Sequence, residues 1–192
     1  MSLTFALVGN QNCGKTTLFN ALTGSNQHVG NFPGVTVEKK EGLVLENKDM
    51  LLVDLPGLYS LSPYSSEEEL TRNFLLYEKP DCILNIADAT NLERSLYLSL
   101  QLFELQIPTV LALNRIDAAK AAGMTIDVTK LTACLGVPVV PISASQKLGL
   151  PALVKEVQNT VSARTLPRLP KFDNTVQSAL QTILNATQNQ TW

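Results

Sequence analysis

The amino-acid sequence predicts an α/β domain with a mostly parallel six-stranded sheet, helices on both faces and one antiparallel edge strand. Short apolar runs alternate with longer stretches whose apolar residues recur at helical spacing. Such alternation is typical of parallel sheets that are covered on both faces. The successive runs 35–45 and 50–53 have no helical stretch between them. This pair predicts the antiparallel edge.

Each expected element has a local signal. Residues 3–8 form an apolar run that ends at a glycine, and the apolar residues of 15–23 share one helical face. Ser65 or Ser66, followed by acidic residues, indicates a helix N-terminus. Residues 25–33 are polar and contain Gly and Pro, which predicts a loop. The remaining expected strands are 82–87, 108–113 and 137–142, and the remaining expected helices are 66–77, 92–105, 127–135 and 150–161.

Length and composition exclude several classes of protein. The chain has 192 residues, 45% apolar and 17% charged, which predicts one domain with a short appendage and excludes a disordered chain. A formal charge of −2 without a Lys/Arg block argues against nucleic acid as a partner. Three widely spaced cysteines predict reduced thiols in a cytosolic compartment. Without a basic leader or a long apolar run, we expect neither a signal peptide nor a membrane span.

The chain divides into two parts. Residues 1–164 contain all of the alternating elements, and we expect them to form one domain. Residues 165–170 are rich in proline, which predicts a linker. Beyond the linker, apolar residues recur at helical spacing, and the face that they form has no later partner in the sequence. We therefore expect residues 165–192 to hold the linker and the truncated start of a further helical domain.

A phosphate-binding loop is predicted where the first strand meets the first helix. Residues 9–16, Gly-Asn-Gln-Asn-Cys-Gly-Lys-Thr, match the pattern G-x-x-x-x-G-K-[ST] in that context. The glycines let backbone N–H groups surround the phosphates. The Lys15 ammonium should reach the β- and γ-phosphates, and the Thr16 hydroxyl should bind Mg²⁺. The nucleotide-binding residues expected here are Gly9, Asn10, Gln11, Asn12, Cys13, Gly14, Lys15, Thr16 and Thr17.

Two further segments are expected to face the γ-phosphate. Asp54 and Gly57 follow a strand in the pattern D-x-x-G, where the carboxylate suits a water-mediated Mg²⁺ contact and the glycine N–H suits the γ-phosphate. Thr36 is the only threonine in the glycine-punctuated stretch 30–39. Its hydroxyl should complete the Mg²⁺ coordination while its N–H meets the γ-phosphate. The other nucleotide-binding residues expected in these segments are Gly34, Val35, Val37, Glu38, Leu55 and Pro56.

Two later strand ends are expected to recognise the base. The Asp117 carboxylate can accept hydrogen bonds from guanine N1–H and the 2-amino group, and adenine would leave it unpaired. Asn114 should brace the loop and the base edge, and the Ala144 N–H should meet guanine O6. The base-recognition residues expected are Asn114, Arg115 and Asp117, followed by Ser143, Ala144 and Ser145.

These signatures, in this order at the carboxyl ends of strands, predict a Ras-like P-loop GTPase that slowly hydrolyses GTP to GDP and phosphate. The catalytic residues expected are Lys15, Thr36 and Gly57. Ras-type enzymes carry a glutamine after the glycine, but this chain has Leu58, so backbone groups should orient the attacking water. Leu58 also keeps open a nucleotide-state sensor with negligible turnover. A translation or ribosome-type GTPase shares the signatures, but the acidic balance counts against it.

Four segments closely resemble the N-terminal G domain of the ferrous iron transport protein B (FeoB) family, and the resemblance covers roughly residues 3–163. It implies that the domain regulates ferrous iron uptake by a membrane transporter, at the cytoplasmic face of the bacterial inner membrane. The implied partners are a helical domain and transmembrane iron-permease domains, and this fragment itself is expected to be soluble. The oligomeric state is left open, a homo-oligomer included. The four segments are residues 9–20, 29–39, 54–61 and 88–98.

The resemblance also implies an activating K⁺. Family members with asparagine at the position of Asn12 bind K⁺ beside the nucleotide, and a cation there can supply the charge that an arginine finger gives elsewhere. Asn12 is therefore an expected catalytic and K⁺-binding residue, with the carbonyls of Gly30 and Phe32 as further ligands. Phe32 stands where the family usually has Trp, and Arg115 where the base motif generally has Lys. The expected cofactors are thus Mg²⁺ and K⁺, with GTP and GDP as substrate and product.

Overall fold

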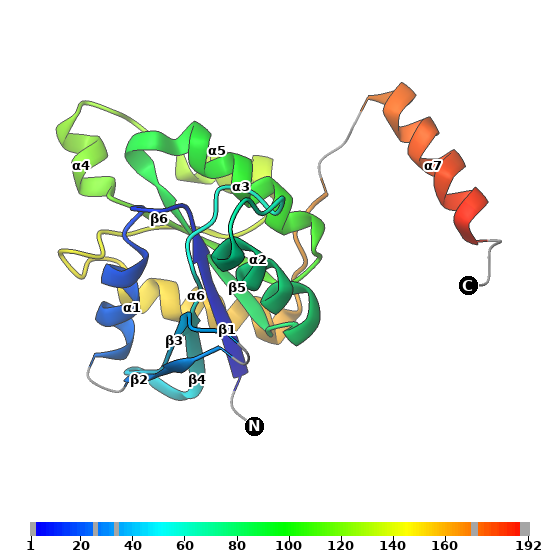
Figure 1. The fold of residues 1–192 in the computed structure, drawn as a ribbon. Helices are drawn as coiled ribbons and strands as arrows, with labels where there is room; N and C mark the ends of the chain where they lie inside the picture. Colours follow the sequence, from blue (N-terminus) through cyan, green and yellow to red (C-terminus); the bar gives the residue numbers. More distant parts are fainter. Residues whose placement is uncertain (1–2, 25–26, 33–34, 170–172, 189–192) are drawn as a thin grey trace.

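A single sheet of seven strands organises the computed structural model of the chain, which describes residues 3–24, 27–32, 35–169 and 173–188 (Figure 1). The strand order in the described part is β2-β3-β4-β1-β5-β6-β7. From β4 to β7 the neighbouring strands run parallel, whereas β2 and β3 are antiparallel. The strands are β1 Leu3–Gly9, β2 Gln27–Asn31, β3 Glu38–Val44, β4 Asn47–Asp54, β5 Cys82–Asp88, β6 Thr109–Asn114 and β7 Val139–Pro141.

Helices cover both faces of the sheet because its central strands are apolar on both sides. In β6, Val110 and Ala112 pack into one apolar cluster with α1 and α6. Leu111 and Leu113 point to the other face, where they pack with residues of α3, α4 and α5. The helices are α1 Lys15–Thr23, α2 Ser66–Asn73, α3 Leu92–Glu104, α4 Ile116–Ala121, α5 Val128–Leu135, α6 Leu150–Ala163 and α7 Asn174–Gln188, with a π-helical turn at Phe74–Glu78 and a 3₁₀ turn at Ala89–Asn91.

The predicted fold class is confirmed, and the structure corrects it at the antiparallel edge. Residues 25–33 were expected to be a loop, but β2 occupies Gln27–Asn31 and raises the sheet from six strands to seven. The expected strand at 35–45 begins only at Glu38. β2 is polar and mostly exposed, so it lacks the apolar alternation that marks a strand in a sequence. Its backbone pairing with β3, from Gln27 opposite Gly42, makes it a strand.

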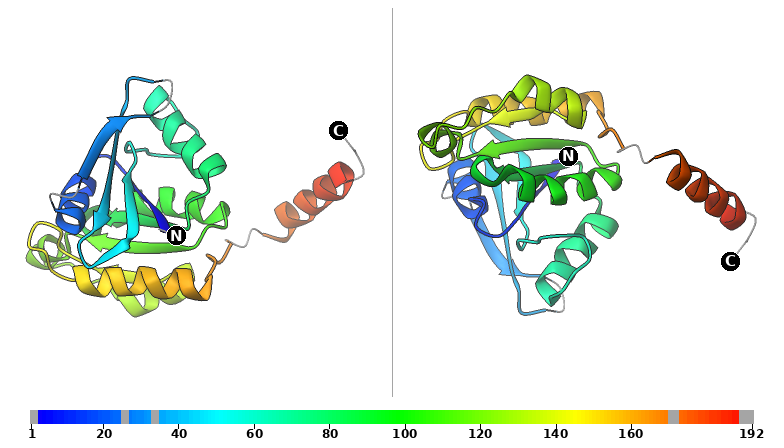
Figure 2. Two further views of the ribbon diagram at one scale, coloured as in Figure 1. Left: turned by 90° about the horizontal axis from the view of Figure 1, so that it is seen from below. Right: turned by 90° about the horizontal axis from the view of Figure 1, so that it is seen from above.

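The short segment after α6 docks on the body of the domain before α7 begins. Gln106 donates from Nε2 to the Pro167 carbonyl at 3.1 Å, and Pro167 is buried. Every α7 side chain that the structure describes is exposed, and α7 lies apart from the sheet and its helices (Figure 2). None of the helices in the described part of the chain combines the length and apolarity that crossing a membrane requires.

A glycine pair tests this docking. Gly136 and Gly123 both have a left-handed backbone, with φ of 69° and 75°. A Cβ on Gly136 would come within 2.6 Å of the Arg168 Cβ, whereas one on Gly123 would meet nothing within 4 Å. We therefore expect Gly136→Ala to lower the free energy of unfolding by more than the roughly 1 kcal/mol that backbone strain costs Gly123→Ala. Chemical unfolding measures both losses, and equal losses would show that the contact with Arg168 contributes nothing.

Candidate functional site

The phosphate loop lies between β1 and α1, as the sequence predicted, and close packing explains its glycines. A Cβ on Gly9 would approach the Ile86 carbonyl oxygen to 2.7 Å, and one on Gly14 would overlap the side-chain amide of Asn114. Gly14 also has a φ of 97°, and Asn12 has a φ of 63°. The loop can therefore keep this path only with glycine at both ends of the motif.

Two neighbouring cavities gather most of the predicted phosphate and Mg²⁺ residues. They share Lys15 and Glu67. Glu67 was not among the predicted site residues, because the acidic run 67–69 indicates a helix N-terminus. The first cavity, of about 530 Å³, is lined by Asn10, Gln11, Asn12, Gly14, Lys15, Thr16, Thr17, Gly57, Glu67 and Arg115. The second, of about 460 Å³, is lined by Lys15, Thr36, Val37, Glu38, Lys40, Asp54, Leu55, Pro56, Ser66 and Glu67.

An ion pair joins a basic and an acidic residue of the second cavity. Lys15 Nζ lies 2.6 Å from Asp54 Oδ1, and the two side chains are 14% and 8% exposed. The residue expected at the phosphates, Lys15, is thus paired with the residue expected near Mg²⁺, Asp54. No group of three or more His, Cys, Asp and Glu able to hold a metal occurs among the described residues. A Mg²⁺–nucleotide site does not require one, since Mg²⁺ binds one or two carboxylates or hydroxyls together with phosphate oxygens.

Asn114 connects the phosphate loop to the last predicted base segment. Its Nδ2 donates to the Cys13 carbonyl at 2.9 Å, and its Oδ1 accepts from the Ala144 N–H at 3.0 Å. That N–H was expected at guanine O6, so a base would share it with Asn114 or displace the amide. Ser143 is buried, and its hydroxyl lies 3.3 Å from that of Ser145. Asp117 accepts from Gln146 Nε2 at 3.0 Å through one carboxylate oxygen.

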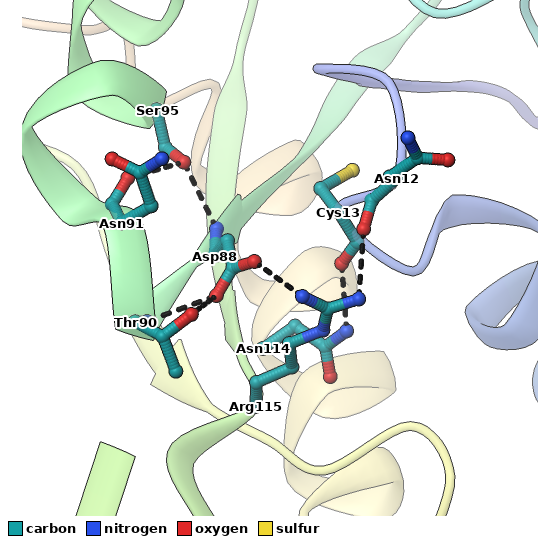
Figure 3. Close-up of polar contacts among 8 residues, drawn as sticks. All are labelled: Asn12, Cys13, Asp88, Thr90, Asn91, Ser95, Asn114 and Arg115. Carbon is teal, nitrogen blue, oxygen red and sulfur yellow. Dashed lines mark hydrogen bonds and ion pairs between the residues drawn. The ribbon is translucent and has the colours of Figure 1, made fainter. Parts of the chain in front are cut away.

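Arg115 fixes the preceding carbonyl of the same loop (Figure 3). Its Nη2 donates to the Asn12 carbonyl at 2.9 Å, and its Nη1 donates to Asp88 Oδ2 at 2.7 Å. Asp88 was not among the predicted site residues. A signal was available, because Asp88 directly follows the apolar run 82–87 and so ends a strand at the same sheet edge as the other motifs.

The segment after Gly57 is tied to the phosphate loop and to α2. Leu58 is fully buried, and its N–H donates to the Gly9 carbonyl at 3.2 Å. Tyr59 donates from its hydroxyl to Gln11 Oε1 at 3.3 Å. The buried Glu68 carboxylate accepts from the N–H groups of Tyr59 and Tyr64, at 3.3 and 2.8 Å. Glu68 was also missed, since only its burial distinguishes it from the other acids of that turn.

The structure does not bring all of the residues that the resemblance assigned to K⁺ into one cavity. Asn12 lines the first cavity, but Gly30 and Phe32 do not. Gly30 pairs with Lys39 between β2 and β3. Phe32 is buried, donates its N–H to the Val37 carbonyl at 3.0 Å and packs edge-on against another ring. Gly34, expected at the nucleotide, lies outside the described residues, and Val35 is exposed.

The Cys13 thiol is buried inside the loop, and burial raises its pKa to about 11, partly offset by the charge of Lys15. Burial likewise raises the pKa of Cys82 to about 12.

Because a thiolate is the reactive form, we expect iodoacetamide at pH 8 to label the exposed Cys134 and to spare both buried thiols. Since the folded pKa of Cys13 exceeds that of a free thiol, its contribution to stability is lost as the pH rises towards 11. Peptide mass spectrometry measures the labelling of each cysteine. As a control, urea should make all three thiols reactive. Labelling of Cys13 as fast as that of Cys134 would contradict the burial of the Cys13 thiol.

Fold and site together define a Ras-like P-loop GTPase domain, with a phosphate loop after β1 and base motifs after β6 and β7. Residues 3–157 match the family model described as ferrous iron transport protein B. The chain therefore belongs to the ferrous iron transport protein B family.

Known relatives agree with this placement. The Fe(2+) transporter FeoB of Legionella pneumophila (strain Paris) is 45% identical over 189 residues, which are 96% of this chain and 24% of the relative. The Fe(2+) transporter FeoB of Escherichia coli (strain K12) is 49% identical over 156 residues, which are 79% of this chain and 20% of the relative. The chain thus spans a quarter or less of the length of these relatives.

Two solved structures share the fold, and each of them is a GDP form. A GDP-bound variant of S. thermophilus NFeoB superimposes with a TM-score of 0.91 at 50% identity, covering 97% of this chain and 73% of that chain. The cytosolic domain of the T. maritima FeoB iron transporter, in a GDP form, gives a TM-score of 0.92 at 39% identity, covering 100% of this chain and 76% of that chain.

Proposed function

We propose that this chain binds guanine nucleotide and slowly hydrolyses GTP to GDP and phosphate, with stimulation by K⁺. The observation that carries the proposal is the Asn114 bridge, because it holds the base motifs directly against the phosphate loop. The relatives solved with GDP bound support the same ligand. In this proposal Asp117 selects guanine through two hydrogen bonds that adenine cannot make.

The proposed reaction is an in-line attack of water on the γ-phosphate, with GDP leaving. Lys15 leaves Asp54 and binds the β- and γ-phosphates, which withdraws negative charge as the bond to the leaving group breaks. The N–H groups of Thr36 and Gly57 hold the γ-phosphate and the attacking water. Backbone groups take this task because Leu58, where a glutamine stands in Ras-type enzymes, has its side chain in the core.

Residues for both cofactors are present. Mg²⁺ would be held by the hydroxyls of Thr16 and Thr36, with Asp54 through water, and would neutralise charge on the phosphate oxygens. K⁺ would be held by the Asn12 side chain, with the carbonyls of Gly30, in β2, and Phe32, just after it, added when this segment closes over the nucleotide. Such a closure is required, because those two residues lie outside the cavity that Asn12 lines.

The proposed role in the cell is control of ferrous iron uptake. In the longer protein, residues 1–164 would form the G domain, and 165–192 would form the linker and the start of a helical domain. The partners would be that helical domain and the transmembrane iron-permease domains, and the location would be the cytoplasmic face of the bacterial inner membrane. Membership in a ferrous iron transport family supports this role and offers no support for a ribosomal one.

Phosphate release from GTP tests the proposal. With Mg²⁺ present, we expect the rate to be roughly tenfold or more higher in KCl than in NaCl, because K⁺ adds positive charge beside the developing transition state. Asn12→Ala should abolish that difference. Asn47→Ala is the matched control, since Asn47 begins β4 at the opposite end of the sheet from the phosphate loop and should leave the KCl-to-NaCl ratio unchanged. GTP binding without turnover in either salt would instead support a nucleotide-state sensor.

A further inference from the structure

Two consecutive residues at the end of β6 donate to two consecutive carbonyls of the phosphate loop. Asn114 donates to the Cys13 carbonyl, and Arg115 donates to the Asn12 carbonyl. Arg115 in turn is held by Asp88 at the end of β5 (Figure 3). We propose that Asp88 is a positioning residue which, through the Arg115 guanidinium, fixes the phosphate loop at Asn12 and slows the release of bound nucleotide. The proposal rests on the nucleotide binding proposed above.

Asp88 is built as a rigid anchor. Its Oδ1 accepts from the Thr90 N–H at 2.9 Å and from the Thr90 hydroxyl at 2.7 Å. Its backbone N–H donates to the Ser95 hydroxyl at 3.1 Å, and the residue pairs with Asn114 across the β5–β6 register. Only Oδ2 is directed at Arg115, and the carboxylate side chain is 13% exposed. A carboxylate whose backbone is fixed and whose other oxygen accepts two hydrogen bonds imposes its own geometry on the guanidinium that it binds.

Arg115 can donate to the Asp88 carboxylate and to the Asn12 carbonyl at the same time. The guanidinium donates from one Nη to Asp88 and from the other to the loop carbonyl, so its plane is defined by two hydrogen bonds. A lysine ammonium is a point charge on a flexible stem, and it would hold the two acceptors without fixing a plane. Because Arg115 is 46% exposed, it needs this second contact to stay on the loop.

The orientation of the Asn12 carbonyl sets the orientation of the next N–H group in the loop. Asn12 has a φ of 63°, in the left-handed region, and the loop is closed there by a long hydrogen bond from the Cys13 N–H to the Asn10 carbonyl, at 3.5 Å. In a trans peptide the C=O and the next N–H point in opposite directions. By holding the Asn12 carbonyl outward, Arg115 therefore keeps the Cys13 N–H turned towards the inside of the loop.

Charge and positioning predict opposite effects for one substitution. The pair of Asp88 and Arg115 carries no net charge. Asp88→Asn frees a positive charge close to the site of an anionic nucleotide, so a purely electrostatic role predicts tighter binding and slower release. A positioning role predicts faster release, because the guanidinium no longer keeps its place on the Asn12 carbonyl.

Dissociation of N-methylanthraniloyl-GDP from the whole chain tests the proposal. We expect Asp88→Asn and Arg115→Lys each to speed release about tenfold. Asp88→Glu restores a carboxylate and should recover part of the slow release. The double variant should be no faster than either single one, because both changes break the same contact. Asp127→Asn is the matched control: it removes the same charge at the N-cap of α5, keeps an oxygen that can accept from the Lys130 N–H, and should leave release unchanged.

The outcomes distinguish a failure of the positioning role from a failure of the proposed nucleotide binding. The positioning role is contradicted if Asp88→Asn releases the analogue no faster than the Asp127→Asn control. It is also contradicted if Asp88→Asn releases the analogue more slowly than the unchanged chain. Equal melting temperatures for these two variants, with only Asp88→Asn fast in release, support it against a general loss of stability. An unchanged chain that does not bind the analogue contradicts the proposed function itself, and this inference with it.

Discussion

The orientation of two carbonyl groups, those of Asn12 and Cys13, is the constraint on which the rest of the site depends. A loop that turns successive N–H groups towards an anion must turn its carbonyls the other way, and buried carbonyls need donors. The donors are Arg115 and Asn114, neighbours in sequence at the end of β6. Because Asn114 also accepts from the Ala144 N–H, one side chain joins the phosphate loop to both predicted base motifs. The parallel order β1-β5-β6-β7 brings these strand ends together.

The basic residues at the site are paired with carboxylates in ways that suit different tasks. Lys15 and Asp54 face each other across the two cavities and are both expected to exchange partners when ligands enter. Arg115 and Asp88 face each other at the end of β5, with the carboxylate fixed by Thr90. The first pair is thus suited to switching, because a phosphate and a metal ion can replace both partners. The second is suited to holding a fixed shape, because its other contacts are all within the protein.

The segment from Gly57 to Glu68 is attached to the phosphate loop and is braced from within. Leu58 donates its N–H to the Gly9 carbonyl, and Tyr59 donates its hydroxyl to Gln11. The buried Glu68 carboxylate, in the first turn of α2, accepts from the N–H groups of Tyr59 and Tyr64 and so holds the segment to that helix. The edge-on contact of Phe32 with Phe74 places the loop before Thr36 against the same region.

The sequence by itself determined the fold class, the phosphate loop and the base motifs, because apolar periodicity and short motifs are local signals. Strand ends such as Asp54 and Asn114 were found for the same reason. The polar edge strand β2 was missed, because its pairing with β3 defines it and its composition does not. Glu67 and Glu68 were missed because their roles depend on neighbours that the sequence does not show. Asp88 could have been noticed as a strand end, but its partner could not, since Arg115 is 27 residues from Asp88 and 103 from Asn12. Only the tertiary structure decided which carboxylate pairs with which basic side chain, and which carbonyls of the loop accept hydrogen bonds. The reason is that these contacts arise where distant strand ends meet at one edge of the sheet.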